Sequence, residues 1–168
     1  MSPKLSYFLV VLISIFLFQN SYSQQNLNGW YWINSQPQAN NLNWVKMIDA
    51  THYFAVGDHG TFMKSTDGGD TWLINSNAGV SDPSFGSGAS LRLYSGWFFN
   101  ANTGYVTGQS VSNDGGKIRR TIDGGNTFTD VGLGIPSGLA RVNDIYFINS
   151  TTGFLCGNNV VKAFKTTD

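Results

Sequence analysis

The hydrophobic and polar positions of the chain repeat with a long period. Three segments share an apolar pair, an Asp or Asn, a small polar turn, three strand-like residues and a glycine. They read "MIDATHYFAVG" (Met47 to Gly57), "FFNANTGYVTG" (Phe98 to Gly108) and "FINSTTGFLCG" (Phe147 to Gly157), and their starts are 51 and 49 residues apart. Several short β-rich segments in a period of this length are typical of a propeller blade with four antiparallel strands.

The alternation within the first unit predicts four strands, at 44–48, 53–56, 61–65 and 71–75. After the first 25 residues no segment keeps a helical period, and the 20 glycines of the 168-residue chain also disfavour helices. We therefore expect a nearly all-β fold, a β-propeller of four-stranded antiparallel blades.

The first 23 residues are predicted to be a secretory signal peptide. Lys4 supplies the positive start, 8–18 form an apolar run, and Ser21 and Ser23 are the small residues of a cleavage site near Gln24. The run is shorter than the roughly 20 residues of a membrane span, although an uncleaved N-terminal anchor stays open. We expect a secreted, periplasmic or cell-surface protein with no membrane span after cleavage.

Residues 24–168 are predicted to form a partial propeller. Blade 1 would cover 42–76, blade 2 91–132 and an incomplete blade 3 142–168. The segment 30–36 contains "YWINS", which resembles "TWLINS" at the end of blade 1, and it would be the outer strand of a closing blade. About two and three-quarter blades are fewer than the ~4–8 that close a ring. We therefore expect an open arc, the N-terminal fragment of a longer protein.

A second motif, [Ser/Thr]-x-Asp-Gly-Gly-x-Thr-[Trp/Phe], occurs as "STDGGDTW" and "TIDGGNTF", and a third copy is cut off at "TTD". It resembles the Asp-box, or bacterial neuraminidase repeat, of sialidase and sortilin propellers. With the preceding strand and Gly turn, the unit is most similar to the repeat of the photosystem II stability and assembly factor family, over residues 30–168. The resemblance implies a scaffold or assembly role, and in related propellers the box lies on the outer rim, away from the ligand site.

The residue types of this motif suit a structural turn. Asp-Gly and Gly-Gly supply positive φ values, the carboxylate and the hydroxyl bond turn amides, and the aromatic ring covers the turn. The predicted structural Asp-box residues are Ser65, Asp67, Gly68, Gly69, Thr71 and Trp72; Thr121, Asp123, Gly124, Gly125, Thr127 and Phe128; and Thr166 and Asp168. An EF-hand needs a bidentate Glu that the motif lacks. We therefore predict no metal ligands and no cofactor.

Composition narrows the function further. Lys plus Arg and Asp plus Glu are 10 each, so no nucleic acid is expected as partner. All ten acids are Asp and only four residues are Arg, whereas a sialidase carries an Arg triad and a Tyr–Glu pair, and a glycosidase needs two carboxyl groups across a cleft. We expect no catalytic residues, and a module that presents loops to a protein or polysaccharide ligand. The alternatives are a fragment of a secreted glycoside hydrolase of the sialidase or xyloglucanase type, and a purely structural module.

Two smaller predictions concern single side chains. Cys156 is the only cysteine, which excludes a disulfide within the chain, and its alignment with Val56 and Thr107 predicts a packed thiol. Near the N-terminus, Trp30 and Tyr31 are candidates for stacking on a carbohydrate.

Overall fold

The computed structural model describes residues 40–75, 91–110, 115–131, 140–158 and 163–167. The chain divides into two units, Met1–Ser35 and Gln36–Asp168, and all described residues belong to the second. The predicted signal peptide, the predicted closing strand at 30–36, and the candidate stacking residues Trp30 and Tyr31 therefore lie outside the described residues. Within the described part every regular element is a strand, apart from the three-residue 3-10 turn η1 (Asp58–Gly60).

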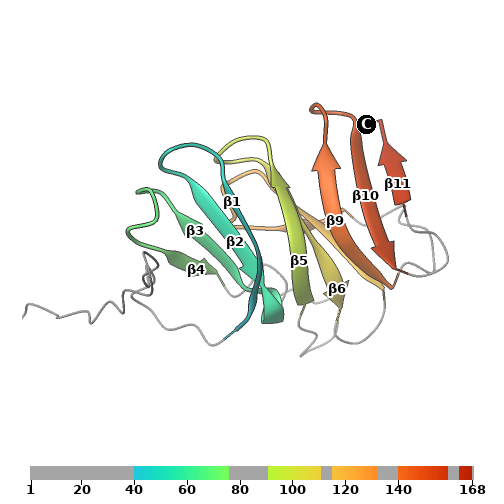
Figure 1. Cartoon of the computed structure of the whole chain (residues 1–168), viewed down its shortest axis with the longest axis horizontal. Helices are drawn as coiled ribbons and strands as arrows, with labels where there is room; N and C mark the ends of the chain where they lie inside the picture. Colours follow the sequence, from blue (N-terminus) through green and yellow to red (C-terminus); the bar gives the residue numbers. More distant parts are fainter. Residues whose placement is uncertain (1–39, 76–90, 111–114, 132–139, 159–162, 168) are drawn as a thin grey trace, which may run out of the picture. The chain divides into compact units, whose positions relative to one another are not determined.

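Three antiparallel sheets follow one another along the chain and in space (Figure 1). The first has the order β1 (Leu42–Met47), β2 (Tyr53–Gly57), β3 (Phe62–Ser65) and β4 (Leu73–Asn75). The second has the order β5 (Leu91–Phe98), β6 (Gly104–Ser110), β7 (Gly116–Thr121) and β8 (Thr129–Asp130). The third contains β9 (Arg141–Phe147), β10 (Gly153–Asn158) and β11 (Ala163–Thr166), with β10 in the middle. The prediction of a nearly all-β fold with four-stranded antiparallel units is confirmed, and the ends of the four strands predicted in the first unit lie within two residues of those of β1–β4.

The first strand of each sheet carries a β-bulge at the same position of the repeat. The residues left unpaired are Asn43 in β1, Tyr94 in β5 and Asn143 in β9. A bulge brings the two backbones close together, and this explains the glycine that ends each repeat. A Cβ on Gly57 would lie 2.0 Å from the carbonyl oxygen of Asn41, and one on Gly108 would lie 2.0 Å from that of Arg92.

The turn between the first two strands of each sheet is closed by an Asp or Asn side chain. In the first sheet Asp49 Oδ1 accepts hydrogen bonds from the amides of Thr51 and His52, both at 2.8 Å. The equivalent acceptors are Asn100, bonded to the amides of Asn102 and Thr103, and Asn149, bonded to those of Thr151 and Thr152. The bonds from the Thr51 and His52 amides, with those from their side chains, hold the pKa of Asp49 well below its usual value.

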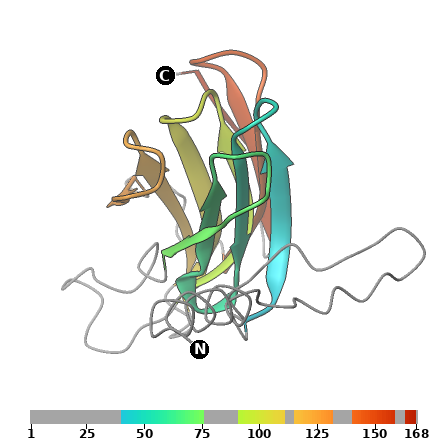
Figure 2. The ribbon, with the colours of Figure 1, turned by 90° about the vertical axis from the view of Figure 1, so that its left-hand side faces the viewer.

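An aromatic cluster joins the first two sheets. Buried side chains from both sheets meet in it: Phe54, Val56, Phe62, Leu91, Leu93, Phe98 and Val106. The rings of Phe54 and Phe98 stack with centroids 4.1 Å apart. Viewed from the side of the first sheet (Figure 2), this sheet lies in front of the other two. Burial of these rings stabilises the interface.

The second and third sheets repeat this arrangement with equivalent residues. Tyr105 takes the place of Phe54 in the repeat and Phe147 that of Phe98, and their rings stack 5.2 Å apart. The buried residues of this second cluster are Ile118, Val142, Ile145 and Phe147. One mode of packing between sheets therefore serves both interfaces.

The first strands of the three sheets are also linked directly. Ser95 Oγ in β5 donates a hydrogen bond to Asp144 in β9, and Lys46 Nζ in β1 lies 3.6 Å from the centroid of the Trp97 ring in β5. The Asp144 carboxylate therefore accepts a hydrogen bond from the neighbouring sheet.

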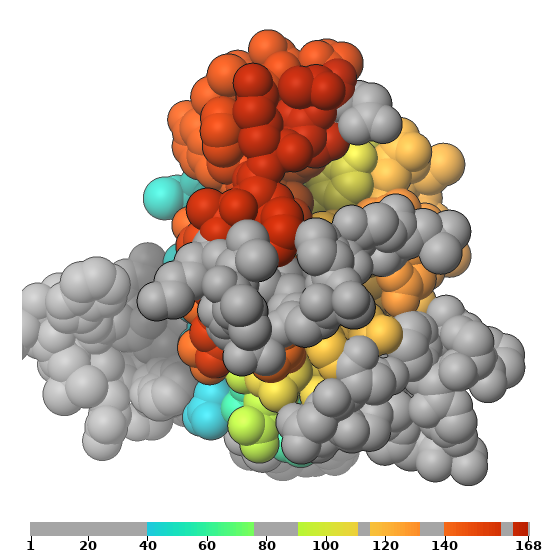
Figure 3. All heavy atoms as spheres, turned by 90° about the vertical axis from the view of Figure 1, so that its right-hand side faces the viewer, coloured from blue at the N-terminus to red at the C-terminus, as the bar shows by residue number. Residues whose placement is uncertain are grey.

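The far face of the third sheet is more exposed than its equivalents. Phe154 is 44% exposed, and the space-filling view of this side shows β9–β11 at the surface (Figure 3). Cys156 is exposed too, so the prediction of a packed thiol is wrong. The equivalent Val56 and Thr107 are covered because another sheet packs on their side of the strand, whereas no described sheet packs on that side of β10.

Candidate functional site

The first Asp-Gly-Gly turn, Ser65 to Trp72, is closed by its own side chains. Asp67 Oδ1 accepts hydrogen bonds from the Ser65 hydroxyl at 2.8 Å and the Thr71 amide at 2.9 Å, and Oδ2 accepts one from the Thr71 hydroxyl at 2.5 Å. Ser65 Oγ in turn accepts the Gly69 amide proton. The Trp72 indole NH donates to the Gly69 carbonyl at 3.1 Å. Both carboxylate oxygens are therefore engaged within the turn.

The second turn, Thr121 to Phe128, repeats this network. Asp123 Oδ1 accepts bonds from the Thr121 hydroxyl at 2.8 Å and the Thr127 amide at 2.9 Å, and Oδ2 accepts one from the Thr127 hydroxyl at 2.6 Å. The amide of Gly125 donates to Thr121 Oγ1 at 2.9 Å. The four glycines of the two turns, Gly68, Gly69, Gly124 and Gly125, all have positive φ. Glycine adopts this conformation with little steric cost.

The hydrogen bonds lower the pKa values of both carboxyl groups. Bonds from the Thr71 hydroxyl and amide, with a smaller one from Ser65, lower the pKa of Asp67 to about 2. Desolvation raises the pKa of Asp123, but the bonds from Thr127 and Thr121 outweigh it, so this pKa also lies below its usual value. Both groups are therefore ionised hydrogen-bond acceptors near neutral pH, which suits neither a general acid nor a shared proton.

The third copy of the motif is only partly described. Thr166 ends β11, and Asp168 lies outside the described residues.

Each complete turn also bonds to the turn between the first two strands of its own sheet. The amide of Gly68 donates to the carbonyl of Thr51 at 3.0 Å, and that of Gly124 donates to the carbonyl of Asn102 at 2.8 Å. The two turns at this end of a sheet are thereby fixed to each other.

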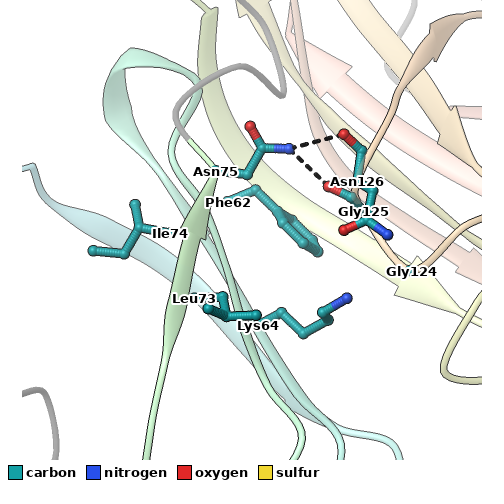
Figure 4. Close-up of a pocket in the computed structure, with 8 residues that line it drawn as sticks. All are labelled: Phe62, Lys64, Leu73, Ile74, Asn75, Gly124, Gly125 and Asn126. Carbon is teal, nitrogen blue, oxygen red and sulfur yellow. Dashed lines mark hydrogen bonds between the residues drawn. The ribbon is translucent and has the colours of Figure 1, made fainter.

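The second turn additionally lies against the first sheet (Figure 4). Asn75 Nδ2, at the end of β4, donates to the carbonyls of Gly125 at 2.8 Å and Asn126 at 3.3 Å. The ring of Phe128 meets that of Phe62 edge-on with centroids 5.1 Å apart. A Cβ on Gly125 would lie only 2.1 Å from the Phe62 ring. The glycine is therefore required both by its φ and by the close approach of the two sheets.

A pocket of about 330 Å³ opens where this turn meets β3 and β4. It is lined by Phe62, Lys64, Leu73, Ile74, Asn75, Gly124, Gly125 and Asn126. Neither Asp67 nor Asp123 is among the lining residues. Lys64 is the one charged residue in the lining, and Figure 4 shows its side chain extending from β3 toward the turn. The arrangement provides a single cation next to the Leu73 side chain and the Phe62 ring, in a lining that also includes Asn75, Asn126 and the turn backbone.

The sequence predictions did not single out this pocket or Lys64. A signal was present, because the residue before the Ser or Thr of each motif is basic: Lys64, Arg120 and Lys165. These three residues occupy equivalent positions, since they pair with Phe54, Tyr105 and Phe154 on the neighbouring strands. What brings Lys64 into a pocket is the packing of the next sheet, which local sequence does not encode.

Two further findings on the described residues concern metal-binding groups and membrane-spanning helices. They hold no group of three or more His, Cys, Asp or Glu side chains that could bind a metal ion. Among them there is also no helix of the length and hydrophobicity that crossing a membrane requires.

Comparisons with known proteins identify the fold. No family model matches the chain, and no curated protein matches it. Among solved structures it is similar to "YCF48 bound to D1 peptide", with 25% identity and a TM-score of 0.57, over 79% of this chain and 39% of that chain. It is also similar to YCF48 from Cyanidioschyzon merolae, with 16% identity and a TM-score of 0.55, over 83% of this chain and 41% of that chain. YCF48 is a β-propeller, so the unclosed sheets described here form part of a β-propeller, as predicted.

Proposed function

We propose that the chain is part of an exported, non-catalytic β-propeller that binds a protein partner and acts as a scaffold or assembly factor. The observation that carries this proposal is the similarity to YCF48 bound to a D1 peptide, which extends over 79% of the chain. YCF48 is a photosystem II assembly factor, and the repeat of this chain resembles the same family. Because the chain spans 39% of that neighbour, the activity of a whole propeller is part of the proposal.

The hydrogen bonds of the turns support a non-catalytic role. A glycosidase needs two carboxyl groups that face a substrate across a cleft. The carboxylates of Asp67 and Asp123 accept bonds from their own turns, and Asp144 accepts one from Ser95. These aspartates therefore stabilise the fold. The equivalence of the two turns with the Asp-box remains part of this proposal, as do the signal peptide and the extracytoplasmic location.

A reconstitution experiment tests the proposal. The tagged protein is crosslinked in its host, crosslinked peptides are identified by mass spectrometry, and the partner is purified and titrated into the full chain by calorimetry. A saturable complex of defined stoichiometry supports the proposal. Failure of every crosslinked candidate to bind on reconstitution would contradict it.

The same preparation separates the alternative functions. Turnover of an aryl sialoside or of xyloglucan oligosaccharides would favour the glycoside hydrolase. Saturable binding to a glycan array, lost when Trp30 and Tyr31 are both replaced by Ala, would favour a polysaccharide ligand.

A further inference from the structure

We propose that the pocket between β3–β4 and the second Asp-Gly-Gly turn binds a carboxylate of an acidic peptide segment. Lys64 would pair with the carboxylate, while Leu73, its partner on β4, would contact an apolar side chain next to it. This inference rests on the proposed function, because it names the chemistry by which a protein partner would be recognised.

The charge of the pocket points to an anion. Lys64 contributes one positive charge, and none of the other lining residues carries a compensating negative charge. The nearest acid of the turn, Asp123, is bonded on both oxygens to Thr127 and does not line the pocket. Lys64 is half-buried, and a partly desolvated ammonium group pairs more strongly with an anion than a fully solvated one does.

The neighbouring polar groups of the turn are already engaged. The amide of Gly124 donates to Asn102, and that of Gly125 donates to Thr121. The side-chain amide of Asn75 donates to the turn carbonyls. A ligand would therefore meet one free cation and no cradle of backbone donors. This favours a carboxylate over a phosphate, which proteins usually hold with several donors or a bidentate Arg.

The walls of the pocket suit an apolar neighbour of that carboxylate. Leu73 is 67% exposed and pairs with Lys64 on the neighbouring strand, so its side chain lies beside the cation, and the buried ring of Phe62 also lines the pocket (Figure 4). A volume of about 330 Å³ holds one or two side chains rather than a folded domain. An acidic residue with an apolar neighbour on a short peptide matches this arrangement.

The test titrates two matched peptides into the ¹⁵N-labelled full chain and follows amide chemical shifts. The probes are N-acetyl-Leu-Asp-Leu-amide and N-acetyl-Leu-Asn-Leu-amide, which differ in the charge of one side chain. We expect saturable shifts at Leu73, Gly124 and Gly125 with the Asp peptide, and binding about two- to fivefold weaker with the Asn peptide. Equal affinity for the two peptides, or tighter saturable binding of inorganic phosphate at the same amides, overturns the proposal.

Variants of matched charge sharpen the test. Lys64→Met should weaken binding of the Asp peptide about two- to fivefold, whereas Lys64→Arg should keep most of it. Lys165→Met should leave binding unchanged, because Lys165 has the equivalent position on β11 but does not line the pocket. Equal losses in Lys64→Met and Lys165→Met would reveal a general charge effect and overturn the proposal. Dispersed amide spectra of each variant confirm that it is folded.

The reconstituted partner distinguishes this inference from the proposed function. Unchanged affinity of Lys64→Met for that partner overturns the pocket as its recognition site while leaving partner binding intact. If the Asp peptide binds specifically but no protein partner is found in the reconstitution experiment, the chemistry of the pocket is supported and the scaffold function is contradicted.

Discussion

The first and third sheets carry the same repeat, yet their equivalent faces have different surroundings. Phe54 in β2 is 0% exposed and stacks on Phe98 of the second sheet, whereas its equivalent Phe154 in β10 is 44% exposed. Val56 is likewise buried and Cys156 exposed. The repeat thus encodes a face that is completed only by the sheet that follows it, in agreement with the nearest-neighbour energetics of repeat proteins.

The largest expected contrast is between the two equivalent phenylalanines. Phe54→Ala removes a fully buried ring and should lower the free energy of unfolding by about 3–5 kcal/mol. Phe154→Ala removes a half-exposed ring and should lower it by about 1 kcal/mol or less. Urea titrations followed by tryptophan fluorescence measure both. Equal losses would show that the face of β10 is as well covered as that of β2.

The next contrast concerns the glycines of the two turns. Gly125→Ala combines a positive φ with a Cβ that would lie 2.1 Å from the Phe62 ring, and we expect a loss of about 2–4 kcal/mol. Gly68→Ala has a positive φ too, but its Cβ would meet its nearest neighbour at 3.2 Å, so a loss of about 1 kcal/mol is expected. The same urea titration serves. A larger loss for Gly68→Ala would contradict the role of the second turn between sheets.

A smaller effect is expected for the side chain that bridges two sheets. Asn75→Ala removes the hydrogen bonds to Gly125 and Asn126 and should cost about 1–2 kcal/mol. The control is Val131→Ala, since Val131 holds the corresponding position after β8 and is partly exposed. Thermal unfolding of both variants shows the difference, and indistinguishable midpoints would mean that the bridging bonds contribute little.

The smallest effect concerns acid sensitivity. The folded-state pKa of Asp49 is lowered, so its contribution to stability is present above the unfolded pKa of about 3.9 and is lost as the pH falls below it. Asn100 and Asn149 close the equivalent turns without a titrating group. Asp49→Asn should therefore keep the midpoint of unfolding near its original value at pH 6 and reduce its fall between pH 6 and pH 3.

Asp67 and Asp123 should account for part of the acid sensitivity that remains in Asp49→Asn. Their pKa values are lowered as well, that of Asp67 to about 2, so acid should still destabilise Asp49→Asn below about pH 4. An unchanged fall in the midpoint for Asp49→Asn would show that the first-sheet turn contributes nothing to acid sensitivity.

The sequence predicts the local parts of this fold well. Hairpins, Asx turns and the Gly-Gly turns involve residues close together in the chain, so their patterns can be read directly. The bulges are different. Simple alternation places Leu91, Leu93 and Trp97 on one face of β5, but the bulge at Tyr94 reverses the phase, and Phe98 instead faces the first sheet with Leu93. Trp97 packs with the other cluster.

The candidate site could not be predicted from the sequence, because it depends on contacts between residues far apart in the chain. Asn75 and Gly125 are 50 residues apart, and nothing in either local pattern indicates that they bond. The exposure of Cys156 was mispredicted for the same cause, since alignment with Val56 identifies the strand position but not whether a sheet covers it.

The bond between Asn75 and the second Asp-Gly-Gly turn has a consequence for synthesis on the ribosome. Once the first sheet has left the ribosome, its Phe62 ring and its Asn75 side-chain amide are available to bind the turn of the second sheet. Folding would then proceed vectorially, from the N-terminus onward, with each nascent sheet ordered by its predecessor.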